Sequence, residues 1–276
     1  MLKLMYITNQ PELAKIAERA GVDRIFVDME YIGKDRRQGG MDTVQSHHTI
    51  SDIKSIRESI DKAELLVRCN PIHNATEEYG SSKEEIDAIV EAGADVIMLP
   101  YFKSLEEVKK FFEYVNGRVH TCLLVETPEA VNIIDEILKI SGVEEIHIGL
   151  NDLSLAYGMK FMFEPLSSGI VENLCLKFKE KGIRYGFGGV AALGDGTLPA
   201  EKIIVEHYRL ESTIVILSRS FCHPDRCQDL VAAKDFFEDE IKRIRDFEKA
   251  VENMTEEKIM QNREEVYRIV SNIVNK

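Results

Sequence analysis

Short apolar runs alternate with segments of helical periodicity along most of the chain. The first run, residues 2–8, precedes residues 11–20, where Leu13, Ile16 and Ala17 fall on one face of a helix. Similar pairs of an apolar run and a helical segment recur further along. The strands that this pattern predicts are residues 2–8, 24–29, 64–68, 95–99, 119–125, 145–148, 184–187 and 213–217.

A series of apolar runs, each followed by a helical pattern, predicts a parallel sheet. We therefore expect residues 1–224 to form a (β/α)8 TIM barrel of the α/β class, for which this length is normal. An open doubly wound sheet is the competing arrangement. Its dinucleotide-binding version is disfavoured because no Gly-x-Gly-x-x-Gly motif follows the first strand.

The C-terminal part of the chain has a different pattern. Residues 225–253 and 256–274 read as two charged amphipathic helices. We expect residues 225–276 to be a helical extension that packs on the barrel or on a neighbouring subunit, and we expect a homo-oligomer.

Composition and charge narrow the possible partners. Of the 276 residues, 44% are hydrophobic, but the longest apolar runs are far too short to cross a bilayer. The net charge of −13 repels phosphate backbones, so we expect neither a nucleic acid nor a membrane as partner. The sequence starts without the pattern of a signal peptide, and the five cysteines are scattered and odd in number. These features predict a cytoplasmic protein with reduced thiols.

Charged residues stand at the ends of several predicted strands, where a barrel places its active site. Glu126 and Asp152 could together bind Mg²⁺ or Mn²⁺ and leave positions open for water and substrate. Alternatively, both carboxylates cap helices or pair with arginine. Arg68 suits bidentate capture of a carboxylate. Its alternative is an ion pair with Asp28 or Glu30, and the two roles are compatible.

At these positions the sequence resembles the HpcH/HpaI aldolase and citrate lyase β-subunit family, which uses a barrel related to phosphoenolpyruvate/pyruvate enzymes. Five segments carry the resemblance, in the expected order and at barrel spacing. They are Phe-Val-Asp-Met-Glu (26–30), Leu-Val-Arg-Cys-Asn (66–70), Gly-Ala-Asp-Val-Ile-Met-Leu-Pro (93–100), Leu-Val-Glu-Thr (124–127) and Ile-Gly-Leu-Asn-Asp-Leu-Ser (148–154).

The resemblance implies a role for each of these strand-end residues. Glu126 and Asp152 would be the metal ligands, and Arg68 would bind the carboxylate and the reacting oxygen of the substrate. The backbone of Gly149, Asn151 and Asp152 would donate N–H groups to the substrate carboxylate. The acidic pair beneath Arg68 would be Asp28 and Glu30.

The sequence also departs from the family pattern. Tyr31 stands where aldolases of this family commonly have a histidine after the acidic pair, and Leu124 stands where a glutamine is common. His48, or its neighbour His47, could supply the missing base; a solvent-exposed or capping histidine is the alternative. Arg219 is a candidate second anchor for an anion, with a surface ion pair as its alternative.

The long polar segment after the second strand offers further charges. Lys34, Arg36 and Arg37 could meet a phosphate or a second carboxylate, although such a run is more often a solvated surface.

Together these features predict a metal-dependent carbon–carbon lyase of the aldolase type that acts on a 2-oxo acid through a pyruvate-like enolate. A metal and Arg68 would supply the positive charge that an enolate oxygen needs. One alternative is a lyase for CoA thioesters of the citrate lyase type. Another is a catalytically reduced barrel that binds a small acid.

Overall fold

The predicted barrel is confirmed. The computed structural model describes residues 1–34, 48–218, 220–222 and 228–276, and in them parallel strands close into one barrel in which β8 pairs with β1. Each strand pairs with the next along the chain. The strands are β1 (Lys3–Ile7), β2 (Arg24–Asp28), β3 (Glu64–Arg68), β4 (Val96–Leu99), β5 (His120–Val125), β6 (Glu145–Ile148), β7 (Arg184–Val190) and β8 (Ile214–Leu217).

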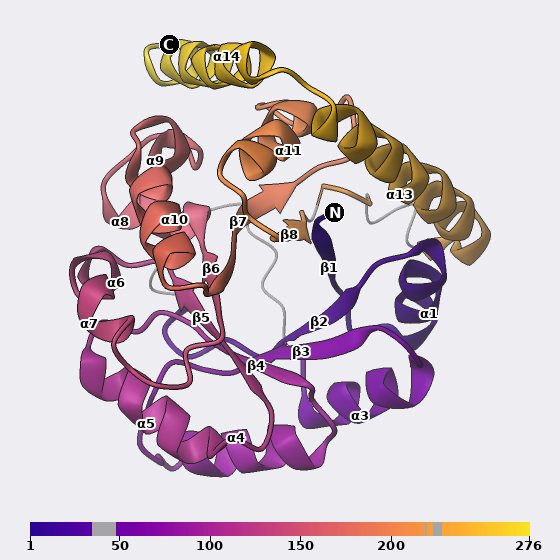
Figure 1. Ribbon diagram of the computed structural model, residues 1–276. Coiled ribbons are helices and arrows are strands. Elements are labelled where there is room, and N and C mark those ends of the chain that lie inside the picture. Colours follow the sequence, from indigo (N-terminus) through magenta and orange to yellow (C-terminus); the bar gives the residue numbers. More distant parts are fainter. Residues whose placement is uncertain (35–47, 219, 223–227) are drawn as a thin grey trace.

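Helices surround the barrel as an outer ring (Figure 1). Capping boxes start three of them, since Thr49, Ser81 and Ser104 each bond the backbone three residues on. The helices are α1 (Pro11–Ala20), α3 (Ile50–Ser59), α4 (Ser82–Glu91), α5 (Leu105–Val115), α6 (Pro128–Asn132), α7 (Ile134–Ile137), α8 (Leu150–Ala156), α9 (Glu164–Ser167), α10 (Ile170–Glu180), α11 (Ala200–Arg209), α13 (Leu230–Glu252) and α14 (Glu256–Val274).

Two elements differ in detail from the sequence pattern. The periodicity predicts one helix from residue 166, but Gly169 adopts a left-handed conformation with φ of 87° and separates α9 from α10. Strand β7 extends to Val190 and contains a bulge, because the step from Gly186 to Gly189 faces a shorter step on β8.

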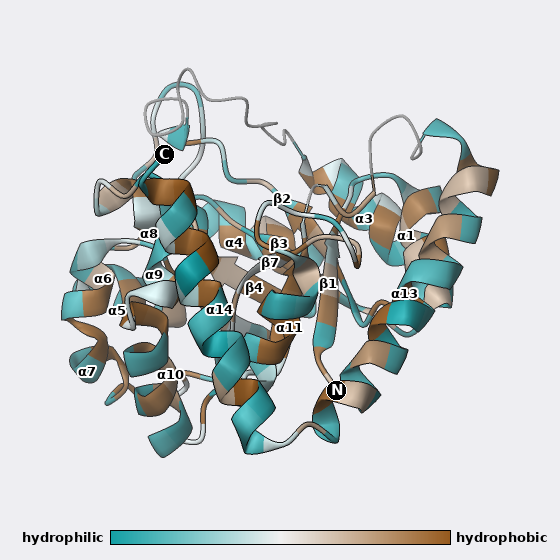
Figure 2. Cartoon of the chain, turned by 90° about the horizontal axis from the view of Figure 1, so that it is seen from above, coloured by the Kyte–Doolittle hydropathy of each residue, from teal (hydrophilic) through white to brown (hydrophobic). Residues whose placement is uncertain are grey.

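Both C-terminal helices contact the barrel of their own chain. Helix α13 packs against α1 and α11 and closes the ring, while α14 lies outside the ring against α11 and α9 (Figure 1). Figure 2 shows α11 between the two. Ion pairs of Glu172 with Arg209 and Arg263 join α10, α11 and α14. The division of the chain at residue 224 and the homo-oligomer stay predictions.

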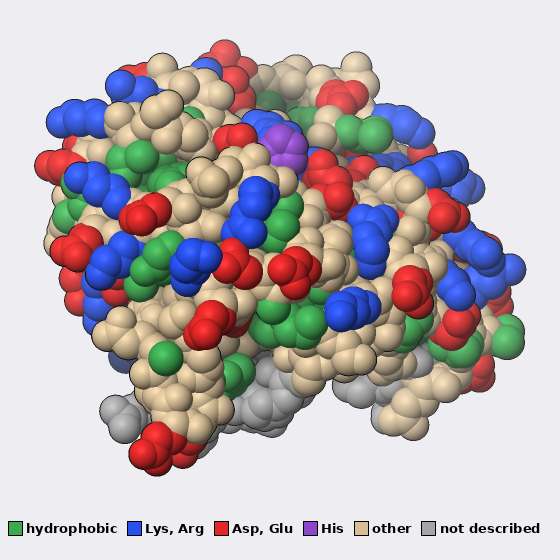
Figure 3. All heavy atoms as spheres, turned by 90° about the horizontal axis from the view of Figure 1, so that it is seen from below, with side chains coloured by type: hydrophobic (Ala, Val, Ile, Leu, Met, Phe, Trp, Pro, Cys, Tyr) green, Lys and Arg blue, Asp and Glu red, His purple; other side chains and the backbone are tan. Residues whose placement is uncertain are grey.

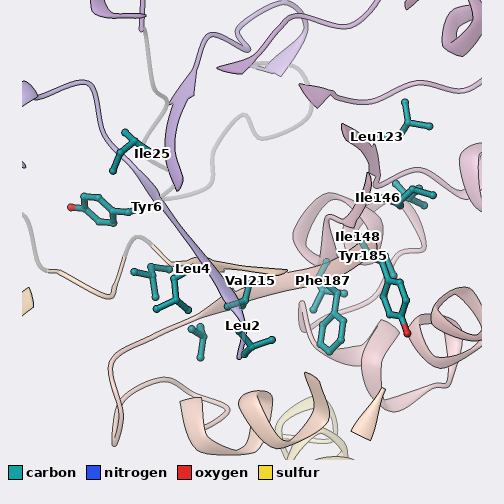
Figure 4. Packing of buried hydrophobic residues seen from close by; sticks show 14 of the residues in the cluster. Leu2, Leu4, Tyr6, Ile25, Leu123, Ile146, Ile148, Tyr185, Phe187 and Val215 are labelled. Carbon is teal, nitrogen blue, oxygen red and sulfur yellow. The ribbon is translucent and has the colours of Figure 1, made fainter. Parts of the chain in front are cut away.

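The barrel separates two apolar cores. The larger one fills the space between strands and helices; Figure 4 shows side chains such as Leu4 and Val215 that belong to it. The smaller core lies inside the barrel. It contains Met5, Phe26, Leu66, Val96, Met98, Cys122, Leu124 and Ile214. Since side chains alternate along a strand, residues two positions away from this inner core also face the barrel axis.

The inner face is polar at both ends of the barrel. At the N-terminal end, Arg24 is 1% exposed and bonds Glu64 and Glu145, and Lys3 also pairs with Glu64.

The outer surface in Figure 3 mixes Lys and Arg with Asp and Glu. Among the helices of the described ranges, none combines the length and the apolar character needed to span a membrane.

Candidate active site

Because side chains alternate along a strand, three charged residues point toward the C-terminal mouth of the barrel. Asp28, Arg68 and Glu126 each stand two positions after a residue of the inner core, so all three face the axis. Asp28 and Arg68 lie directly opposite each other in the β2–β3 register. The inner-core residues that precede them are Phe26, Leu66 and Leu124.

Arg68 is held by both acidic residues that the sequence analysis placed beneath it. Its Nε and Nη2 donate to the two carboxylate oxygens of Asp28, at 2.8 and 2.7 Å. Its Nη1 lies 3.3 Å from Oε2 of Glu30. The alternative ion-pair role of Arg68 is therefore present. A guanidinium has five N–H groups, so groups remain that can bind a substrate.

The charged state of this pair is strongly favoured. Burial by itself lowers the pKa of Arg68, but the facing carboxylates of Asp28 and Glu30 outweigh it and raise that pKa well above its ordinary value. Burial likewise raises the pKa of Asp28, and here the cations Arg68 and Lys34 outweigh it and hold the pKa far below its usual range. Both groups are therefore ionised over the physiological pH range.

Lys34 joins this cluster from the segment after β2. Its Nζ lies 3.1 Å from Oδ2 of Asp28 and 3.6 Å from Oε2 of Glu30, and its side chain is only 2% exposed. Lys34 therefore pairs with carboxylates of the protein itself and is not part of a solvated surface. The sequence alone did not indicate this contact. Arg36, Arg37 and His47 lie outside the described residues.

Contacts from the loop after β3 and from α4 fix the turn that carries Lys34. Oδ1 of Asn70 accepts hydrogen bonds from the backbone N–H groups of Tyr31 and Ile32, both at 2.9 Å. Nδ2 of Asn70 in turn donates to Glu85 at 2.8 Å. The Lys34 N–H then donates to the Tyr31 carbonyl and completes the turn. Sequence reasoning quoted Asn70 in the motif of residues 66–70 but gave neither Asn70 nor Glu85 a role, because neither is close to Lys34 along the chain.

Glu126 is fixed from two sides. It is 2% exposed, and its Oε1 accepts the backbone N–H of Tyr101 at 2.9 Å. Tyr101 has φ of 48°, a conformation that costs energy for a residue other than glycine. On the other side lies Gly149, where an added Cβ would stand 2.8 Å from Oε2 of Glu126. The absence of a side chain at Gly149 therefore allows the Glu126 carboxylate to lie against the backbone of that residue.

The segment 149–152 begins helix α8, and Asp152 lies in its first turn, 8% exposed. The N–H of Gly149 donates to the carbonyl of Val125, so it belongs to the barrel's own hydrogen bonds. The first turn of a helix directs N–H groups outward, which leaves Asn151 and Asp152 as the donors that the resemblance implies.

His48 reaches the same cluster. Its Nδ1 accepts the backbone N–H of Asp28 at 3.0 Å. Burial lowers the pKa of His48, although Asp28 and Asp52 oppose this effect. A neutral imidazole that accepts at Nδ1 carries its proton on Nε2. His48 is therefore arranged to donate a hydrogen bond from Nε2. Arg219, the candidate second anchor, lies outside the described residues.

Comparison with known proteins identifies the family of this chain. Residues 3–164, more than half of the chain, match the model of the HpcH/HpaI aldolase/citrate lyase family. The chain belongs to this family. The match spans Asp28, Arg68, Glu126 and Asp152 and supports the lyase or aldolase class of enzyme. No functionally curated protein matches the chain.

Solved structures similar to this HpcH/HpaI chain share its fold at low identity. The HpcH/HpaI aldolase from Desulfitobacterium hafniense DCB-2 is 18% identical with a TM-score of 0.59, over 79% of this chain and 86% of that one. An HpcH/HpaI aldolase/citrate lyase family protein from Burkholderia cenocepacia J2315 is 14% identical (TM-score 0.58; 79% and 87% covered). The citrate synthase SbnG is 15% identical (TM-score 0.57; 84% and 92% covered).

The mouth of this HpcH/HpaI barrel fits a divalent cation by its charge. The six described charged residues that the sequence analysis singles out at the strand ends are four carboxylates and two cations, with a formal net charge of −2. Within the described ranges no three His, Cys, Asp or Glu side chains gather as a metal site. A cation bound by Glu126 and Asp152 would therefore take its other ligands from water and substrate. The residues counted are Asp28, Glu30, Lys34, Arg68, Glu126 and Asp152.

Proposed function

We propose that this HpcH/HpaI protein is a divalent-metal-dependent carbon–carbon lyase of the aldolase type that acts on a small 2-oxo acid. The observation that carries the proposal is the bidentate Arg68–Asp28 pair at the barrel mouth, in the same inward-facing position as Glu126. Such a pair holds a guanidinium in one orientation before the substrate arrives, which lowers the entropy cost of binding.

Charge balance supports the metal requirement. The six strand-end residues counted above carry a formal charge of −2, which would repel an anionic substrate. Mg²⁺ or Mn²⁺ would neutralise that charge. Glu126 and Asp152 would hold the ion, and its chemistry there would be that of a Lewis acid for the 2-oxo oxygen. The N–H groups of Arg68 that do not face Asp28 and Glu30 would bind the substrate carboxylate and the same oxygen.

In the proposed cleavage a base takes the proton from the hydroxyl group on C4 of the substrate. The C3–C4 bond then breaks, C4 leaves as an aldehyde, and the electron pair moves through C3 and C2 to the 2-oxo oxygen. Arg68 would stabilise this enolate oxygen. A proton added at C3 completes the conversion to the 2-oxo acid product. We give His48 the role of hydrogen-bond donor through Nε2, because its Nδ1 is already used by Asp28.

A catalytically reduced barrel that binds a small acid is the second candidate. The observation that favours it is the same hydrogen bond to His48, which occupies the nitrogen that a base would need, together with Tyr31 at the usual histidine position. Binding and turnover separate the two candidates. Cleavage of 4-hydroxy-2-oxo acids with Mn²⁺ supports the lyase; metal-dependent binding without cleavage of any such acid supports the binding barrel.

The first test is thermal unfolding with Mn²⁺ and oxalate, which mimics the pyruvate enolate. A ligand at a hundred times its dissociation constant stabilises by about 2.7 kcal/mol. We expect wild type to shift upward with both ligands together, Glu126→Gln to lose the shift, and the exposed control Glu129→Gln to keep it. If the unfolding temperature of wild type does not change with both ligands present, the support for a metal–enolate site is lost.

A further inference from the structure

Lys34 places a second buried cation beneath the substrate-binding arginine. Its Nζ touches Oδ2 of Asp28, the same oxygen that Nη2 of Arg68 contacts, and it lies within ion-pair distance of Glu30. Lys34 also donates to the carbonyl of Glu30 at 3.4 Å. The two carboxylates and the two cations therefore form one buried cluster of formal charge zero.

The position of Lys34 is built by the surrounding structure. Glu85 of α4 holds Asn70, Asn70 holds the backbone of the turn, and the turn directs the lysine side chain onto Asp28. A lysine costs much energy to bury without partners, and this one has three oxygen contacts. A chance surface contact would not need this support.

Charge explains what the lysine does for its neighbour. Without Lys34, the two carboxylates would exceed Arg68 by one negative charge at a buried position, where screening by water is weak. The electrostatic attraction of Arg68 for an anion would then be cancelled by Asp28 and Glu30. With Lys34 present, one cation balances the acidic pair and the other remains effective toward the mouth.

We infer that Lys34 is a positioning residue that keeps Arg68 effective for binding the substrate carboxylate, although it need not touch the substrate itself. This inference rests on the proposed function of Arg68 at the mouth. It predicts opposite effects on the two ligands of the site. Removing the lysine charge weakens the binding of an anion and leaves the binding of a cation unchanged or tighter.

The experiment measures both ligands separately in Lys34→Met. We expect calorimetry at saturating Mn²⁺ to show oxalate binding weakened about tenfold, which corresponds to about 1.4 kcal/mol. Titration with Mn²⁺ alone should show an affinity no weaker than that of wild type. Lys83→Met, an exposed lysine paired with Asp87 on α4, is the matched control and should change neither affinity.

The double variant Glu30→Gln/Lys34→Met restores the formal neutrality of the cluster. We expect it to bind oxalate more tightly than Lys34→Met, and it decides the question if the single variant does not fold. The inference is overturned if Lys34→Met binds oxalate like wild type, or if Mn²⁺ and oxalate affinities fall together and the double variant restores neither. If wild type itself binds no oxalate with Mn²⁺, the proposed function has failed instead.

Discussion

The carboxylate of Asp28 and the guanidinium of Arg68 face each other across β2 and β3 and form two parallel hydrogen bonds, of 2.8 and 2.7 Å. This geometry needs the planar fork of arginine, and a lysine ammonium cannot reproduce it. The relationship therefore links the register of two neighbouring strands to the orientation of the proposed substrate-binding group.

Arg68→Lys should keep a positive charge and still lose the site. We expect oxalate binding in the presence of Mn²⁺ to weaken about a hundredfold, or about 2.7 kcal/mol, because the two parallel bonds are lost. Calorimetry measures the change. Arg118→Lys, at an exposed ion pair with Asp87, should bind oxalate like wild type. Equal affinity in Arg68→Lys would show that charge alone is sufficient.

Gly149→Ala should displace Glu126. The new Cβ would lie 2.8 Å from Oε2 and 2.9 Å from Cβ of that residue, which is closer than atoms pack. We expect a loss of about 1–3 kcal/mol in the free energy of unfolding and a Mn²⁺ affinity at least tenfold weaker. Gly80→Ala is the control for stability, because the tightest contact of its added atom, 3.0 Å, is with the flexible carboxylate end of Glu84. Unchanged Mn²⁺ binding would argue against Glu126 as a ligand.

Glu145→Gln should affect stability without affecting ligands. Glu145 is 2% exposed and pairs with Arg24 at the opposite end of the barrel from the mouth. Removing one partner of a buried pair costs about 3–5 kcal/mol when the other charge is left alone. Arg24 keeps Glu64 as a partner, so we expect a loss below this range. Chemical denaturation should show this loss, whereas folded Glu145→Gln should bind Mn²⁺ and oxalate like wild type. A large drop in oxalate affinity would contradict this separation of the two ends.

Acid should weaken the fold before its carboxylates titrate. Burial lowers the pKa of His147 to about 4, and burial together with His147 lowers that of His207 to about 3. The unfolded chain binds these protons from about pH 6.5 downward, whereas the folded chain does not. The stabilisation by these two neutral histidines is thus complete above about pH 6.5. It is lost as the pH falls toward 4, and the total loss is on the order of a few kcal/mol.

The replacement His207→Phe tests this assignment. His207 stacks on Phe187 at a centroid distance of 3.9 Å, so a phenyl ring keeps the ring contact and removes the titrating group. Denaturation at pH 7.5 and pH 5.0 should then show a smaller difference in unfolding free energy than in wild type. An undiminished difference would assign the acid sensitivity to other groups.

The barrel and much of the mouth could be predicted from sequence, because alternation of apolar runs and helices is a local signal. The same signal placed Arg68 and Glu126 at strand ends. The role of Lys34 could not be predicted, since it depends on a turn held by Asn70 and Glu85, which come from other elements. The bulge at Gly186–Gly189 and the helix break at Gly169 were also missed, because glycine allows such conformations without requiring them.

The alternation of inner and outer side chains means that the register of a strand fixes the position of all its inward-facing residues together. In β2 a single register directs Arg24 to the N-terminal end of the barrel interior, Phe26 to the inner core and Asp28 to the mouth. Inserting one residue early in this strand would turn all three outward together and bring their apolar neighbours inside. In β2 the N-terminal ion pairs, the inner core and the proposed site therefore depend on one register, whereas loops beyond a strand can vary in length and specificity.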